Sequence, residues 1–342
     1  MKLVDINVWF GMDGRGTLKI GDYEDKRRKD ARFAILTTGL KNLDPDIIAI
    51  QEANKLPAYV NKLARVLNYD AVWKVANAGL KVMGWGIPLN FTAGNAILAK
   101  KGYSLQYLGA KRLSGWGIQG DLFSIHFKEM RNAMAAKVII NGQPVVIFNT
   151  QTHYSLILDE TWRQAIDEFL RKSLLSTRER NRILKKIQAS HLRTEKEIIK
   201  LLTFVKDVTR KHNYPFVIMG DFNTTTDSPA LTELIRELGL LDPYGLKSLD
   251  PHSYTWDPLR NSNTQYDGSN FRADGATRKG LRERIEAQFD SRVSRRIDFI
   301  FLSPHFTRDM IADAQLIFTK PTGDLFVSDH YGLKVVLRDL PP

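Results

Sequence analysis

The chain has 342 residues, of which 43% are hydrophobic, so it can bury a sizeable core and lacks the composition of a disordered protein. It contains no cysteine, which excludes disulfides, thiolate metal sites and a cysteine nucleophile. The 50 lysines and arginines outnumber the 38 aspartates and glutamates, and the resulting charge of +12 favours a polyanionic partner such as nucleic acid, an anionic membrane surface or a phosphorylated substrate. A basic balance that serves only solubility is the alternative.

The sequence shows no apolar run of membrane-spanning length and no visible signal peptide. We therefore expect a soluble, cytoplasmic protein, or a secreted one if a signal peptide has been removed ahead of Met1.

Strand-like and helix-like patterns mix along the whole chain, and nothing resembles a linker, so one domain covering 1–342 is expected. The predicted elements, in order, are a strand at 3–9, a helix at 25–42, a strand at 46–52, a helix at 57–67, strands at 71–75, 95–99, 104–108 and 122–127, a hairpin over 137–149, helices in at least two segments over 159–211, a strand at 216–219, a helix at 230–239, a short helix at 281–288, and strands at 296–302 and 332–337. This mixture predicts an α/β fold in which two sheets pack face to face with helices outside.

The stretch 215–224 carries the clearest chemical signal. Four apolar residues follow Pro215, which suits a strand buried on both faces, and Gly220 then permits a sharp turn. Asp221 and Asn223 come next, and two residues apart in extended chain they point the same way. A carboxylate and an amide aimed together can hold a water and a developing anion. A plain turn is the alternative, because Gly-Asp and Asn-Thr are common turn formers.

Polar residues stand at the ends of several other predicted strands, where strand ends on one edge of a sheet would converge. Each has an ordinary structural explanation: Glu52 as a helix cap, His153 as a half-buried histidine, Asp298 as a partner of a neighbouring arginine. The full set is Asn7, Glu52, His153, Asp221 with Asn223, Asp298, and Asp329 with His330.

Oxygen ligands without thiolates suit a hard cation, Mg²⁺ or Mn²⁺. A zinc site would need more histidines at metal spacing, and the chain has only seven. A histidine beside carboxylates can act as a general acid or base or stabilise charge on a phosphate.

In their order, these motifs resemble the metal-dependent endonuclease/exonuclease/phosphatase superfamily, which includes deoxyribonucleases and neutral sphingomyelinases. The matching motifs span nearly the whole chain: Asn7 in Ile-Asn-Val-Trp, Gln51-Glu52, Asn149 to His153, Gly220-Asp221-Phe222-Asn223, Arg296-Ile297-Asp298 and Ser328-Asp329-His330. The resemblance implies a four-layer α/β/β/α sandwich of two mixed sheets flanked by helices, with the site at one edge of the sheets.

The resemblance also implies roles for the metal-binding residues. Glu52 would be the principal ligand of Mg²⁺ (or Mn²⁺), Asn7 would help to position the ion, and Asp329 would lie near the ion or the water.

For the catalytic residues, the resemblance implies that Asp221 orients or deprotonates the attacking water and that Asn223 bonds to the phosphoryl oxygens. His330 would contact the phosphate, oriented by Asp298, although a base role for His330 stays open.

One position departs from the family pattern, because Gln151 stands where many members have a histidine. His153, two residues on, would then be a second catalytic histidine if it reaches the site. Asn149, Gln151 and Asn95 are expected to contact substrate.

The predicted reaction is hydrolysis of a phosphodiester by water attack at phosphorus. A phospholipid headgroup of the sphingomyelinase type is the leading substrate because of the Asn7-x-Trp9-x-Gly11 start, and DNA or RNA is the alternative because of the net charge. A non-catalytic relative that serves as a binding module is a third possibility, opposed by the retained site residues.

The stretch 171–186 holds seven basic residues against one acidic one. We expect it to be part of a basic helical insertion at about 158–190, in contact with nucleic acid or an anionic membrane surface. A solvated helical face is the alternative.

Overall fold

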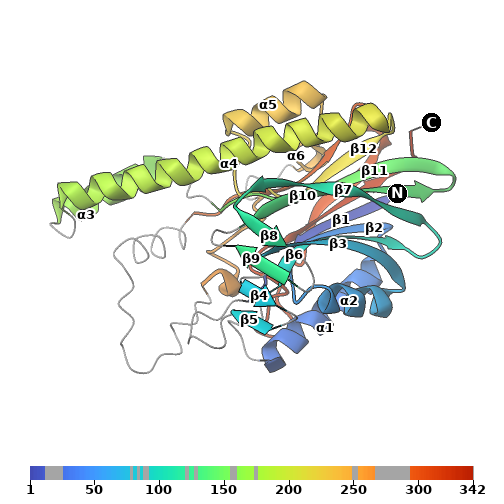
Figure 1. Ribbon diagram of the computed structural model, residues 1–342, viewed down its shortest axis with the longest axis horizontal. Helices are drawn as coiled ribbons and strands as arrows, with labels where there is room; N and C mark the ends of the chain where they lie inside the picture. Colours follow the sequence, from blue (N-terminus) through green and yellow to red (C-terminus); the bar gives the residue numbers. More distant parts are fainter. Residues whose placement is uncertain are drawn as a thin grey trace.

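The computed structural model describes the chain in eleven ranges, namely residues 1–11, 26–77, 80–82, 85–87, 92–119, 123–126, 130–154, 160–172, 176–248, 253–265 and 293–341. These residues form two mixed β-sheets packed face to face, with helices on both outer faces (Figure 1). The predicted fold class is therefore confirmed.

The first sheet has six strands in the order β14 (Ile311–Ile317), β15 (Gly332–Leu337), β1 (Lys2–Asn7), β2 (Ile47–Asn54), β6 (Ala93–Lys100) and β3 (Tyr69–Asn77). The second has five, in the order β13 (Asp298–Leu302), β12 (Phe216–Asp221), β11 (Gln143–Gln151), β10 (Arg131–Ile140) and β7 (Ser104–Ser114). A small third sheet consists of β5 (Trp85–Ile87), β4 (Leu80–Val82), β9 (Phe123–His126) and β8 (Gly117–Gln119).

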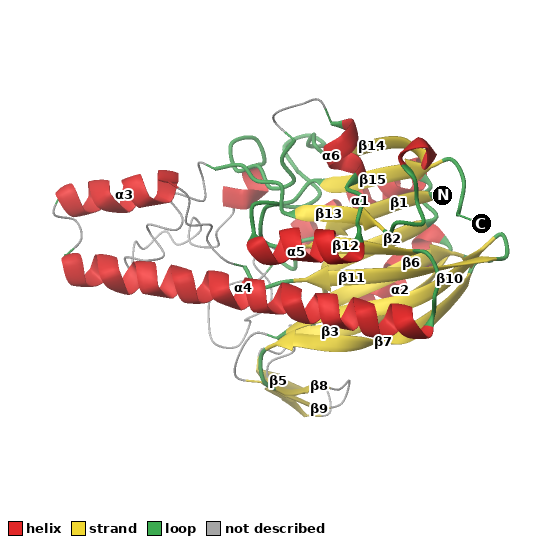
Figure 2. Cartoon of the chain, turned by 90° about the horizontal axis from the view of Figure 1, so that it is seen from above, coloured by secondary structure: helices red, strands yellow, loops and turns green. Residues whose placement is uncertain are grey.

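The helices are α1 (Lys26–Leu43), α2 (Ala58–Leu67), α3 (Glu160–Arg171), α4 (Thr177–Lys211), α5 (Pro229–Leu238) and α6 (Pro243–Lys247). Side chains of α1 and α2 pack on the first sheet, and side chains of α4 and α5 pack on the second. Both views show α3 and the first half of α4 extending beyond the sandwich (Figures 1 and 2). The helical prediction over 159–211 is confirmed for its described residues, which form α3 and α4, whereas the short helix predicted at 281–288 lies outside the described residues.

Strand β12 shows why the sheets stack in this way. Val217 and Met219 point into the core between the two sheets, while Phe216 and Ile218 point into the core beneath α4 and α5. Because its residues are buried on both faces, β12 can sit only in the middle of a layered fold.

Gly220 lets β12 pass close beside β11 just before the site. Its φ is 145°, and a Cβ built there would lie 2.0 Å from the carbonyl oxygen of Thr150. We expect Gly220→Ala to destabilise the protein by about 3 kcal/mol or more, because the backbone must move. Gly142 also has a positive φ, of 83°, but open space around it. Gly142→Ala should cost only about 1 kcal/mol, and equal losses for the two variants in urea unfolding would contradict this account.

Candidate active site

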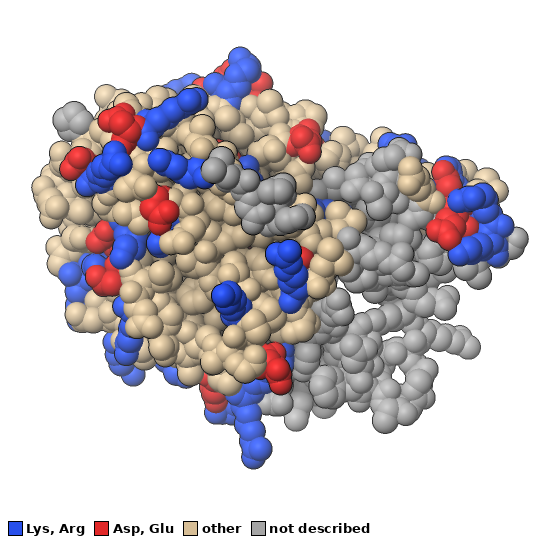
Figure 3. All heavy atoms as spheres, turned by 180° about the vertical axis from the view of Figure 1, so that it is seen from behind, with Lys and Arg blue, Asp and Glu red and all other residues tan. Residues whose placement is uncertain are grey.

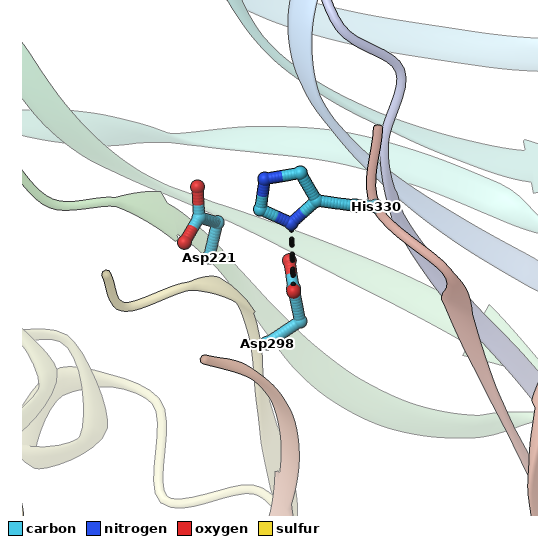
Figure 4. Close-up of side chains that lie close together, drawn as sticks. All are labelled: Asp221, Asp298 and His330. Carbon is cyan, nitrogen blue, oxygen red and sulfur yellow. Dashed lines mark hydrogen bonds and ion pairs between the residues drawn. The ribbon is translucent and has the colours of Figure 1, made fainter. Parts of the chain in front are cut away.

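The parallel pairings of β1 with β2 and of β11 with β12 bring the carboxyl ends of four strands to one edge of the sandwich. β13 runs antiparallel to β12, so its first residue, Asp298, lies opposite Asp221, the last residue of β12. Asp221, Asp298 and His330 each offer an atom within 4.8 Å of the others (Figure 4). Of the groups among the described residues, this is the one that combines three such side chains so closely.

His330 is held by Asp298. Its Nδ1 lies 2.9 Å from Asp298 Oδ2, and both side chains are buried. A carboxylate only accepts, so the imidazole donates from Nδ1, and its other ring nitrogen points away from Asp298 (Figure 4). Burial by itself lowers the pKa of His330, but the charge and hydrogen bond of Asp298 outweigh it and raise that pKa well above its usual value. The raised pKa favours the protonated form of His330, and with it charge stabilisation over the base role.

A second structural feature keeps Asp298 and His330 together. The Thr255 hydroxyl accepts from the backbone N–H of Asp298 at 3.1 Å, while its carbonyl oxygen accepts from the N–H of Tyr331 at 2.7 Å. Asn261 donates to the carbonyl oxygen of Ser328 at 2.9 Å. The sequence analysis did not assign Thr255 a role, since nothing in one sequence shows which distant backbone a buried hydroxyl will bind.

Asp221 is surrounded by amide donors. Its Oδ2 accepts from Asn7 Nδ2 at 3.1 Å, from Asn223 Nδ2 at 3.0 Å and from Gln151 Nε2 at 3.3 Å. Asn223 meets Asp221 because a left-handed turn (φ 47°) folds the chain back, and not because both lie in extended chain. Burial first, and the nearby Asp298 next, raise the pKa of Asp221 to about 6. At neutral pH it is an ionised base of moderate strength, held in a fixed orientation.

Glu52 does not end its strand as the sequence suggested. It lies inside β2 at a bulge, where the pairing with β6 shifts register and Glu52 takes a φ of 59°. A bulge re-aims a side chain toward a sheet edge. Burial first, and the nearby Asp329 next, raise the pKa of Glu52 to about 7. The position that the family pattern assigns to the metal is thus occupied by a carboxylate whose charge is poorly compensated by the protein.

Gln151 connects Glu52 to a buried arginine. Its Nε2 donates to Glu52 Oε1 at 2.6 Å, and its Oε1 accepts from Arg131 Nη1 at 2.5 Å. Arg131 thereby fixes which end of the Gln151 amide faces Glu52 and Asp221. Sequence reasoning missed Arg131, because it lies at the start of β10 and reaches the site only through strand pairing.

Arg32 on α1 holds the loops that carry site residues. Its guanidinium donates to the carbonyl oxygens of Val8, Trp9 and Val327, at 3.0, 3.1 and 2.6 Å. It also stacks on the Trp9 ring at 4.7 Å. Val327 precedes Ser328-Asp329-His330, and Val8 and Trp9 follow Asn7. Arg32 therefore holds two site segments together, the one after β1 and the one before β15. The helical pattern at 25–42 gave no sign of this buried charge.

The residues at this edge fit a hard divalent cation. Glu52 and Asp329 interact electrostatically, the Asp329 pKa is raised by burial, and Asp298 Oδ1 is buried without a hydrogen-bond partner among the described residues. A concentration of oxygen ligands whose ionisation is disfavoured is relieved by a bound cation. Of the residues predicted to bind it, Asn7 has its Oδ1 engaged by the N–H of Trp9 at 3.0 Å, so its metal contact remains a prediction.

The asparagines predicted to contact substrate lie deeper than the site. Asn149 is fully buried and donates to the carbonyl oxygens of Ile50 and Ala96, at 2.9 and 2.7 Å, which links the two sheets. Asn95 donates to the carbonyl oxygen of Asn132 at 3.1 Å and is also buried. These contacts give both residues a cross-sheet structural role, and their substrate contacts remain predictions.

His153 lies just beyond the end of β11 and is half-buried. Its N–H donates to Glu197 Oε2 at 2.5 Å, and its carbonyl oxygen accepts from Thr194 Oγ1 at 2.7 Å, so its backbone is bound to α4. Among the described residues it does not belong to the close group of Asp221, Asp298 and His330. A catalytic role for His153 remains a prediction.

The raised pKa of Glu52 predicts how stability depends on pH without metal. A carboxyl group whose pKa rises from 4.5 to about 7 on folding binds more protons in the folded than in the unfolded state between those values. Its contribution to stability is therefore lost as the pH rises through that window. We expect the Tm of the metal-free protein to fall relative to that of Glu52→Gln, which does not titrate there. Mg²⁺ should raise the Tm of the wild type above pH 7 more than below pH 4.5, and a Tm difference that is independent of pH would contradict this.

Comparisons with known proteins agree with the family resemblance and with the observed fold. The model of the endonuclease/exonuclease/phosphatase family matches residues 6–330. No curated protein matches the sequence. Among solved structures, D. rerio TDP2 complexed with a single-strand DNA product is 17% identical, with a TM-score of 0.54 over 98% of this chain and 97% of that one.

Two further structures are similar to the chain at low identity. A Bacteroides thetaiotaomicron mannosyl-6-phosphatase is 14% identical, with a TM-score of 0.56 over 99% of this chain and 100% of that one. The human Nocturnin catalytic domain with bound sulfate is 14% identical, with a TM-score of 0.54 over 98% and 93%. At identities this low, the structural likeness shows a shared fold and nothing more.

Proposed function

The chain belongs to the endonuclease/exonuclease/phosphatase family, and from this premise we propose that it is a divalent-metal-dependent phosphodiester hydrolase. The observation that carries the proposal is the buried Asp298–His330 pair facing Asp221, whose carboxylate is held by three amide donors. In this proposal Asp221 is the base that accepts a proton from water, and His330 is the cation that contacts the phosphate, both at one edge of the sandwich.

Each residue has a distinct part in the proposed reaction. Asp221 accepts a proton from the attacking water, because it is ionised at neutral pH and its orientation is fixed. Asn223, whose amide nitrogen donates to Asp221 and to the carbonyl oxygen of Thr152, would exchange one of these two bonds for one to a phosphoryl oxygen. His330, kept protonated by Asp298, stabilises the negative charge that develops on the phosphoryl group as the bond to the leaving oxygen breaks. Asn7 and Gln151 keep Asp221 in place.

The proposed metal site consists of Glu52 with Asp329 beside it. When bound there, Mg²⁺ or Mn²⁺ would supply a Lewis acid for the phosphoryl oxygen and neutralise charge on it. The protein's own part is to hold the Glu52 carboxylate through Gln151 and the bulge in β2.

A phospholipid headgroup is the weaker of the two substrate candidates. Trp9 of the Asn7-x-Trp9 start is only 9% exposed and is covered by Arg32, so this motif has a packing explanation. The exposed pair Trp116 and Ile118, at 64% and 62%, is the observation that keeps a lipid headgroup as a second candidate. No helix among the described residues is long and apolar enough to span a membrane.

Net charge alone does not select the substrate. On the face in Figure 3, basic and acidic side chains intermingle over the sandwich, and no large patch of one sign covers it. Nucleic acid stands as the first candidate because of the basic stretch at 171–186, whose proposed role is contact with phosphates.

A parallel assay separates the candidates. The purified protein with Mg²⁺ is offered bis(p-nitrophenyl) phosphate, sphingomyelin vesicles, single- and double-stranded DNA, and RNA. The proposal predicts EDTA-sensitive hydrolysis of the small diester and of at least one natural diester. Hydrolysis of none of these diesters would reject it.

A further inference from the structure

A cavity of about 520 Å³ lies beside the proposed site, between the helical hairpin α3–α4 and the loop that joins β12 to α5. Its volume falls in the range of sites for small ligands. The side chains used in the argument below come from three elements: Arg163, Leu184, Gln188, His191, Thr225 and Pro229.

The cavity is connected to the site through both of its walls. On the loop side, its lining begins at Thr224, the residue after Asn223. On the helix side, Glu195 accepts from the Ser228 hydroxyl at 2.5 Å, which fixes α4 to the same loop. The end of β11 is also bound to α4, through the backbone of His153. A group in the cavity would therefore keep a fixed position relative to Asp221 and Asn223.

The lining suits a flat ring with polar edges. Leu184, Gln188 and His191 are spaced four and three residues apart, so they share one face of α4. Leu184 and Pro229 provide apolar surface on opposite walls, while Gln188 and His191 provide an amide and an imidazole at the edge. Thr225 adds a hydroxyl from the loop. A nucleobase with its sugar matches this combination, because its faces are apolar and its edges form hydrogen bonds.

The surroundings of the cavity favour a strand with several phosphates. Arg163 and one carboxylate, that of Asp227, are exposed in its lining. Four further basic side chains are exposed on α4 close by, and they outweigh the single carboxylate: Arg178, Arg182, Lys185 and Lys186. A helix is about 10 Å wide, comparable to the Debye length at physiological salt, so these charges act at the cavity. Among the described residues of 176–192, Leu192 is the one large apolar side chain that is exposed, at 49%, and a single leucine offers little surface to acyl chains.

We propose that this cavity binds the nucleoside next to the scissile phosphate of a single nucleic-acid strand. Through this contact, α4 gives the enzyme its preference for a nucleic-acid strand over a lipid. The inference rests on the proposed function and names the substrate class of the same site.

The test fills the cavity with Gln188→Trp, an exposed position whose replacement leaves the core intact. Thr203→Trp, exposed on the same helix outside the cavity, is the matched control. Two quantities are measured: kcat/KM on a single-stranded oligonucleotide and on bis(p-nitrophenyl) phosphate, and binding of the fluorescent oligonucleotide in EDTA by anisotropy. Gln188→Trp should lower both oligonucleotide values by about 10-fold, the loss of roughly one base contact, and leave the small diester within about 2-fold.

The outcomes are distinguishable. Unchanged oligonucleotide binding and turnover, or equal losses on both substrates, would overturn the inference. A selective loss on sphingomyelin vesicles would assign the cavity to a lipid and equally reject a nucleoside. If the wild type hydrolyses no diester, the proposed function fails, while the binding comparison still decides whether the cavity holds the strand.

Discussion

Glu52→Gln is expected to lower metal-dependent hydrolysis by about 100- to 1,000-fold at saturating Mg²⁺. The glutamine keeps the size of the side chain but removes the charge that would hold the cation. The same variant should need a higher Mg²⁺ concentration for half-maximal rate. Both quantities come from one titration of rate against Mg²⁺ with a small diester.

The control for this variant is Glu233→Gln, at a half-exposed glutamate that pairs with Arg236 on α5. It should keep wild-type activity. A Glu52→Gln enzyme that runs near the wild-type rate would show that the metal binds elsewhere at the sheet edge.

His330→Gln is expected to lower kcat by about 100- to 10,000-fold, because the variant loses the cation that is proposed to face the phosphate. Asp298→Asn should show a large part of this loss, since it removes the carboxylate that holds the imidazole at 2.9 Å and keeps it protonated. Because the two residues act as one unit, the double variant should be no slower than His330→Gln alone. Steady-state kinetics of the three variants measure this coupling.

His305→Gln provides the matched control, since His305 is exposed and bonds only to Ser303 among the described residues. Additive losses from His330 and Asp298 would mean that Asp298 acts on something other than the imidazole. A ratio of the Asp298→Asn rate to the wild-type rate that rises as the pH falls would support its role in keeping His330 protonated, because protonation of Asp221 lowers both rates alike.

The site residues at the ends of buried strands were the most predictable part of the molecule. The apolar run before Gly220 forces β12 into the interior, and the chain after it must emerge with Asp221 at a sheet edge. Asp298 and His330 follow the same logic on β13 and just before β15. Their convergence depends on the order of the strands in the two sheets, which the strand pairing shows. The family resemblance implied only that the site lies at one edge of the sheets.

The details that one sequence cannot give are those that depend on pairing across the sheets. The bulge that turns Glu52 is set by the register of β2 against β6, and the contact of Arg131 with Gln151 is set by β10 lying beside β11. Strand β14 was missed for a similar reason. Its register shifts between Ile311 and Asp313, so its burial does not alternate, and the period that marks a strand is absent.

Gln151, at a position where the family resemblance implies a histidine in many members, has a structural account. An imidazole there would be one more partly charged group beside His330, whereas the Gln151 amide donates to Glu52 and to Asp221 while accepting from Arg131. The positive charge moves one step away, to Arg131. The site thereby keeps a cation near its carboxylates without a second group that titrates at neutral pH.

The central claim, water attack at phosphorus, is tested most directly by hydrolysis of bis(p-nitrophenyl) phosphate in ¹⁸O-labelled water with Mg²⁺. Mass spectrometry of the products of wild-type turnover should find the label in the phosphomonoester and none in the p-nitrophenol. Label in the p-nitrophenol, or no hydrolysis above the EDTA control, would contradict the account.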